Sequence, residues 1–193
     1  HVHDWRYGVR HVGDVPGELI ETWSEGKLQY PAHALCNRML FDDYDLILSI
    51  GQIVPHEVVG MANFTKNIMV GVGGDDMINK SHFLGAVYNM ERIMGRIDTP
   101  VRKLFNYGAQ TFLGELPIHY ILSVMAKDPE SGRMVMRGLY AGDDMETFAE
   151  GARLSQAVNL DLLDDPLPKV VVYLDPHEFQ STCLGNKPLS RTP

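Results

Sequence analysis

Hydrophobic positions along the chain change their spacing several times, and each change predicts an element. The stretch 44–54 is an almost continuous apolar run that stops at Pro55, as expected of a strand buried on both faces. A second, shorter apolar run at 67–72 is stopped by two glycines and predicts another strand or extended segment. Buried strands of this kind are typical of α/β sheets.

Helical spacing occurs three times. Residues 77–96 repeat apolar side chains every three or four positions, with two aspartates before them and arginines towards the end. Proline suits the first turn of a helix, so a second helix is predicted from Pro100 to about Leu113. The stretch 145–158 has the same periodicity and predicts a third helix.

Turn residues separate the remaining segments. Residues 118–125 and 134–140 flank a turn and predict a hairpin, whereas residues 1–43 are interrupted by glycine and proline and predict loops with one or two short strands. An acidic linker with two prolines is expected at 161–168, and another buried strand at 169–175.

The sum of these elements predicts an α/β fold, a mixed sheet with flanking helices, that forms part of a two-domain protein. We expect residues 1–167 to be one α/β domain and residues 168–193 to begin a second. The chain has 193 residues, 45% of them hydrophobic, which is enough for one sizeable core.

Charge, apolar run length and cysteine content argue against several classes of protein. The formal net charge of −8, without a basic cluster, argues against nucleic acid as a partner. No apolar run approaches the roughly 20 residues that span a bilayer, and no leader-like segment opens the chain. Cys36 and Cys183 lie far apart and are expected to be reduced thiols. We therefore expect a cytoplasmic enzyme without a membrane partner.

Three side chains combine chemical capability with suggestive positions. His56 follows the predicted strand at its carboxyl end, where α/β sheets usually bind ligands and where a general base could stand. Lys66 enters an apolar segment, which favours a nucleophile or covalent anchor, and His82 lies early in a predicted helix. By spacing alone each also has an ordinary explanation, as a loop histidine, a surface lysine and a helix histidine.

Taken together, these residues resemble the signature of the nickel-pincer lactate racemases. That family has a histidine in a Pro-His motif, a lysine ten residues later and a second histidine sixteen residues after the lysine, and the same intervals separate His56, Lys66 and His82. Further family-like segments are HDW at 3–5, FDDYDLILSIG before the motif, VGVGG after the lysine and GNKPLSRT near the end.

The resemblance implies a racemase or epimerase of a 2-hydroxy acid, with residues 1–167 as its cofactor-bearing domain. A nickel-pincer nucleotide would be joined covalently to Lys66, and His82 would be the fourth donor to its square-planar nickel. His56 would act as a catalytic acid/base and Lys187 would contact the substrate. The implied partners are a small hydroxy acid and the proteins that synthesise the cofactor.

Two departures from the family pattern affect what can be expected. Many members have a glycine-rich stretch before the lysine, whereas this chain has Met61-Ala62-Asn63-Phe64, so we expect a bulkier or differently bent cofactor pocket. The family's upstream region, with an arginine and a first catalytic histidine, is absent from these residues, so we expect this chain either to be part of a longer protein or to work differently from the family.

Two other functions compete with this interpretation. The first is a metal-dependent hydrolase or lyase that uses His56 and His82 directly on zinc or another ion. The second is a non-catalytic module that binds the cofactor or a hydroxy acid. Metal retention in Lys66→Ala would favour the hydrolase, because the pincer interpretation predicts loss of the metal.

Overall fold

The computed structural model describes residues 2–161, 169 and 171. Its strands are β1 (Val9–Val15), β2 (Ala32–Asn37), β3 (Ile47–Gln52), β4 (Pro55–His56), β5 (Gly60–Met61), β6 (Ile118–Lys127) and β7 (Met134–Gly142). Its helices are α1 (Gly17–Trp23), α2 (Asp75–Tyr88), α3 (Pro100–Leu113) and α4 (Met145–Asn159), with short helical turns η1 (Arg38–Phe41), η2 (Asn67–Gly71) and η3 (Met90–Arg92).

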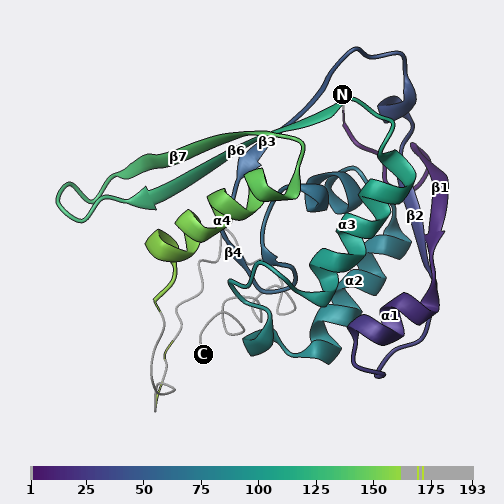
Figure 1. Cartoon of the computed structure of the whole chain (residues 1–193), viewed down its shortest axis with the longest axis horizontal. Helices are drawn as coiled ribbons and strands as arrows, with labels where there is room; N and C mark the ends of the chain where they lie inside the picture. The colour runs from purple at the N-terminus through teal and green to yellow at the C-terminus, as the bar shows by residue number, and fades with distance from the viewer. Residues whose placement is uncertain (1, 162–168, 170, 172–193) are drawn as a thin grey trace.

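The main sheet has three strands in the order β3-β6-β7. Strand β3 runs parallel to β6, and β6 and β7 form an antiparallel hairpin. Helix α4 packs along β6 and β7, and the far end of the hairpin projects beyond the rest of the chain (Figure 1). This arrangement confirms the predicted α/β fold with a mixed sheet and flanking helices.

A second layer lies on the other side of the molecule. Strands β1 and β2 pair antiparallel, and helices α2 and α3, which lie side by side, pack against β2 and β1 respectively (Figure 1). One cluster of buried apolar side chains joins both layers, and it includes Cys36 of β2, Met77 of α2, Phe105 of α3 and Leu122 of β6.

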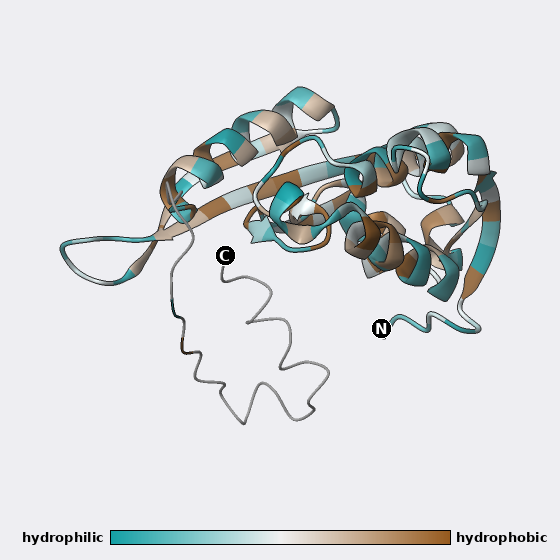
Figure 2. Cartoon of the chain, turned by 90° about the horizontal axis from the view of Figure 1, so that it is seen from below, coloured by the Kyte–Doolittle hydropathy of each residue, from teal (hydrophilic) through white to brown (hydrophobic). Residues whose placement is uncertain are grey.

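The predicted hairpin and the predicted helices α3 and α4 are confirmed, and their boundaries lie within two residues of the predicted ones. Pro100 opens α3, and the Thr99 hydroxyl caps it by accepting a hydrogen bond from the Arg102 amide. The Asp144 carboxylate caps α4 in the same way through the Thr147 amide. Figure 2 shows hydrophilic residues at the hairpin tip and hydrophobic residues along the strands behind it.

The first predicted helix is shorter than its periodicity suggested. Helix α2 ends at Tyr88 because Asn89 adopts a positive φ of 80°, which breaks the helical path. The apolar residues beyond it belong to η3 and the following turn.

The prediction that the run at 44–54 is buried on both faces was wrong for the described part of the chain. Strand β3 is at the edge of its sheet, and Leu48 and Ile50 are 50% and 68% exposed. Met136 and Leu139 of β7 are exposed as well. Helix α4 covers only one face of the sheet, so an apolar run alone did not reveal which face is open.

The prediction of an extended segment at 67–72 was also wrong. Residues Asn67–Gly71 form a π-helical turn, η2. A short apolar run cannot be assigned to strand or helix by periodicity. Here the helical conformation is stabilised by packing against α2 and α3. π-Helical turns occur preferentially at functional sites.

The opening segment is more regular than predicted, because helix α1 lies between the two strands β1 and β2. The predicted linker at 161–168, most of the strand at 169–175 and the domain boundary after residue 167 lie outside the described residues. No helix among the described residues is long and apolar enough to cross a membrane.

Candidate functional site

His56 ends the short strand β4, which follows β3 along the chain and pairs with β5 through His56 and Gly60. Its side chain is 15% exposed. The Val58 amide donates a hydrogen bond to His56 Nδ1 at 3.1 Å, and Glu57 Oε2 lies 3.6 Å from the same nitrogen. Because Nδ1 accepts from the Val58 amide, the neutral ring carries its proton on Nε2, and we assign proton exchange with a ligand to that nitrogen.

The hairpin that carries His56 is closed by a glycine. Gly60 has a φ of 90°, and a Cβ there would lie 2.1 Å from the Arg96 carbonyl oxygen. A side chain at this position would therefore displace either the hairpin or the segment beside it.

Lys66 follows two residues with an unusual backbone. Asn63 and Phe64 have φ values of 73° and 59°, in the left-handed region that favours glycine. The chain thus makes a glycine-like bend with two residues that are not glycine. This bend leads directly into η2, with Lys66 in helical conformation at its start.

Side-chain contacts hold this bend in place. Asn63 Oδ1 accepts hydrogen bonds from the Phe64 amide and from Asn67 Nδ2, each at 2.7 Å. The ring of Phe64 packs between Tyr120 and Phe148, at centroid distances of 4.4 and 5.1 Å. These contacts offset the cost of left-handed backbone in two non-glycine residues.

Arg102 of α3 fixes the same segment from within the core. Its guanidinium donates hydrogen bonds to the carbonyl oxygens of Met61 and Asn63 and to the Thr65 hydroxyl, and it lies over the Phe148 ring. Burial lowers the pKa of Arg102 to about 9, so the group remains a cation at neutral pH. This role could not be predicted from the sequence, since an arginine in an amphipathic helix is usually exposed.

His82 lies on α2 and is half-buried. Its Nδ1 is 2.6 Å from the Ile78 carbonyl oxygen, one helical turn earlier. A carbonyl can only accept, so Nδ1 carries the proton and the neutral ring has its lone pair on Nε2. Histidines that bind metals are usually oriented by a hydrogen bond of this kind.

The elements that carry these three side chains contact one another. Turn η2, which follows Lys66, packs against α2, the helix of His82. Val58, two residues after His56, approaches the backbone of Gly85 on α2, where an added Cβ would lie 3.2 Å from Val58 Cγ1. Lys187, the predicted substrate contact, lies outside the described residues.

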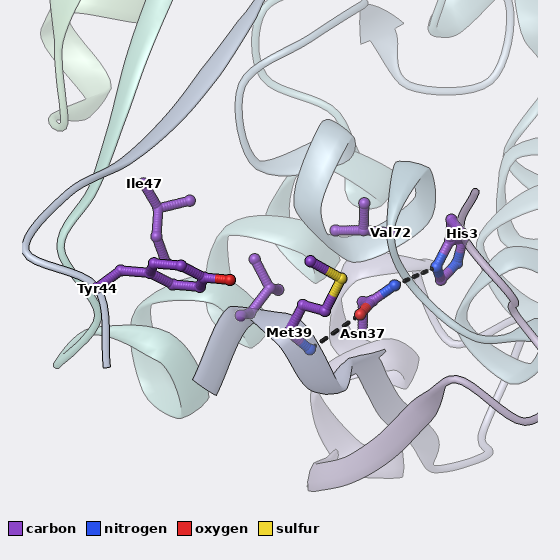
Figure 3. Close-up of a pocket in the computed structure, with 7 residues that line it drawn as sticks. His3, Asn37, Met39, Tyr44, Ile47 and Val72 are labelled. Carbon is purple, nitrogen blue, oxygen red and sulfur yellow. Dashed lines mark hydrogen bonds between the residues drawn. The ribbon is translucent and has the colours of Figure 1, made fainter. Parts of the chain in front are cut away.

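A contact missed from the sequence joins two of the family-like segments. His3 of the HDW segment donates from Nε2 to the Gly73 carbonyl at 2.9 Å, and its Nδ1 accepts from the Asn37 amide at 2.8 Å. His3 and Asn37 line a pocket of about 290 Å³, whose other residues are mostly apolar (Figure 3). The conformation of the VGVGG segment therefore depends on a residue about 70 positions earlier.

No family model matches the chain, and no curated protein matches it. Several solved structures resemble it, including the following two. A crystal structure of a protein from Thermotoga maritima has a TM-score of 0.74 and 24% identity, over 86% of this chain and 41% of that one. The lactate racemase apoprotein from Thermoanaerobacterium thermosaccharolyticum has a TM-score of 0.58 and 18% identity, over 81% of this chain and 33% of that one.

The fold is related to that of lactate racemase. At these identities the likeness establishes the fold alone, because one fold can serve many functions. This chain spans less than half the length of either solved structure. The function of this chain therefore depends on its site residues.

Proposed function

We propose that this chain is the cofactor-bearing part of an isomerase that racemises or epimerises a 2-hydroxy acid with a nickel-pincer nucleotide joined to Lys66. The observation that carries the proposal is the hydrogen bond from His82 Nδ1 to the Ile78 carbonyl, which leaves Nε2 as the metal donor. The related fold and the intervals between His56, Lys66 and His82 support the same function.

The residues fit the cofactor chemically. A lysine amine can form a covalent attachment, and an imidazole nitrogen is a suitable donor for square-planar Ni(II). Lys66 and His82 would hold the group. When bound, it supplies a reversible acceptor for the hydride of the carbinol carbon.

His56 would exchange the hydroxyl proton of the substrate through Nε2. Because Nδ1 accepts from the Val58 amide, the neutral ring carries its proton on Nε2 and would donate it to the substrate oxygen. To accept a proton at Nε2 instead, the ring must release the Val58 contact and carry its proton on Nδ1, where Glu57 Oε2 is the nearby acceptor. Glu57 would thus position His56 and set its tautomer. Its side chain is only 4% exposed, so little water competes for this contact.

Lys187 would contribute a cation near the substrate carboxylate. The remaining partners of this proposal are the hydroxy acid itself and the proteins that make the cofactor and attach it.

Co-expression with cofactor-synthesis proteins tests the attachment. Intact-protein mass spectrometry should find wild-type chain heavier than its sequence mass, and Lys66→Ala at its sequence mass without bound nickel. Lys103→Ala is the matched control, since Lys103 is a half-exposed lysine of α3 paired with Asp98. It should keep both the added mass and the nickel.

Two results would contradict the proposal. Equal, unmodified masses for wild type and Lys66→Ala would exclude covalent attachment. Metal retained in Lys66→Ala would favour the hydrolase or lyase. Deuterium exchange at the carbinol carbon, measured on this chain and on the complete gene product, separates the racemase from a binding module.

A further inference from the structure

A second cluster of potential metal ligands lies on the β1–β2 pair, outside the site described above. His11 Nε2 and His33 Nδ1 are each 2.6 Å from the same oxygen, Asp14 Oδ1. The three donor atoms all lie within 4.8 Å of one another, and the side chains are about half exposed. Two imidazoles and one carboxylate form a donor set typical of transition-metal sites.

A β-bulge brings these side chains to one face. Residues three apart on a regular strand point to opposite faces, so His11 and Asp14 would ordinarily be separated. Here His11 pairs with Leu35 and Gly13 with Ala34, which makes Val12 an extra residue. Asp14 pairs directly with His33, and the extra residue returns His11 to the same face.

Packing of α3 holds the bulge in place. The residue after the inserted one is Gly13, and a Cβ there would lie 2.3 Å from the Phe112 ring. A larger residue would displace either the ring or the strand, so β1 lies closely against the helix. On the partner strand, the His33 amide donates to Asp76 Oδ2 at 2.7 Å. The backbones that carry the donors are thus anchored to α2 and α3.

We propose that His11, Asp14 and His33 bind a divalent transition-metal ion of the Zn²⁺ class. Ligands about 2.0–2.1 Å from a tetrahedral ion are separated by roughly 3.3 Å, so each imidazole would move back from Asp14 by less than about 1 Å. The half-exposed side chains can make that adjustment. The protons now directed at Asp14 would pass to the other ring nitrogens, and solvent would complete the coordination.

This site shares no residue with the proposed nickel site. The proposal of this metal site is therefore independent of Lys66 and of the isomerase proposal. Oxygen-preferring ions should not occupy it, because two of its three donors are nitrogens.

Isothermal titration of the full chain with ZnCl₂ tests the proposal. Wild type and Lys66→Ala should each bind one more equivalent of Zn²⁺ than His33→Ala or His11→Ala, or bind it at least about tenfold more tightly. The control is His119→Ala, which removes an exposed histidine of β6 and should bind as wild type does. Because the side chains of His11, His33 and His119 are substantially exposed, circular dichroism should show unchanged folds for their alanine variants.

A thermal readout distinguishes this site from adventitious binding to unfolded chain. Binding to the folded pair of strands should raise the Tm of wild type with Zn²⁺, but not that of His33→Ala, and Mg²⁺ should have no effect. The proposal is overturned if wild type and His33→Ala bind Zn²⁺ with the same stoichiometry and affinity. Loss of binding in His119→Ala would also overturn it.

Discussion

The guanidinium of Arg102 donates a hydrogen bond to the Thr65 hydroxyl, with 3.0 Å between Nη1 and Oγ1, one residue before Lys66. Thr65 donates in turn to Asn106 Oδ1 at 2.7 Å. Two turns of α3 are thereby tied to the bend that leads into the candidate anchor. The position of Lys66 is set by a buried cation from a distant part of the sequence.

Replacing this cation should destabilise the fold. In Arg102→Met the carbonyl oxygens of Met61 and Asn63 lose their buried donor, so the free energy of unfolding should fall by roughly 2–4 kcal/mol. Urea unfolding measures the change. Arg133→Met, at an exposed arginine before β7, should leave the midpoint unchanged. An unchanged midpoint in Arg102→Met would show that the hydrogen bonds only offset the cost of burying the charge.

The left-handed backbone at Asn63 should reverse the usual order of stability, in which an alanine variant is more stable than a glycine variant. Asn63→Ala loses two hydrogen bonds and keeps the strain, whereas Asn63→Gly loses the same bonds and relieves it. We expect the alanine variant to be less stable than the glycine variant by about 1 kcal/mol, measured by urea unfolding. If alanine is as stable as glycine, the bend does not have the conformation described.

Cys36 should be an unreactive thiol whose burial makes stability depend on pH. Burial raises the pKa of the Cys36 thiol from 9.0 to about 12. Between those pH values the folded chain keeps a proton that the unfolded chain loses. The thiol's contribution to stability is therefore complete below pH about 9 and is lost as pH rises towards 12.

Two measurements check this in a Cys183→Ser background. A thiol reagent at pH 8 should label Cys36 quickly in urea but only slowly in the folded chain. The free energy of unfolding should fall between pH 9 and 10, and less steeply when Cys36 is also replaced by Ala. Rapid labelling of the folded chain at pH 8 would contradict the burial of Cys36 in β2.

At the proposed nickel site, covalent attachment of the cofactor to Lys66 and binding of nickel by His82 should be separable by mutation. His82→Ala removes the metal donor but not the attachment, so the chain should keep its added mass at Lys66 and lose nickel by elemental analysis. His119→Ala should retain both. Nickel at the wild-type level in His82→Ala would show that another residue is the fourth donor.

Glu57 should act through His56. In Glu57→Gln the amide can donate to Nδ1 and so favour the tautomer with its proton on Nε2, which cannot accept one there. The rate of deuterium exchange in the loaded complete protein should fall by about 10²–10⁴-fold with an altered pH profile. A purely structural role would lower the stability of the fold without changing the pH profile of the remaining activity.

Local sequence determined the regular elements. Helix α3 begins at Pro100 after a capping threonine, and the turn residues between β6 and β7 define their hairpin, because these signals depend only on neighbours a few positions away. The pattern also predicted the mixed α/β fold. It identified His56, Lys66 and His82 as candidates by chemistry and interval, although their roles remain predictions.

Tertiary structure determined features that the spacing of residues along the sequence could not predict. Packing against α2 and α3 made residues 67–71 a π-helical turn, and α4 left one face of an apolar strand exposed. The Arg102 contacts and the His11–Asp14–His33 cluster join residues from different elements, and the cluster also needs an inserted residue in β1. Such features arise from long-range packing, which the periodicity of a single segment does not encode.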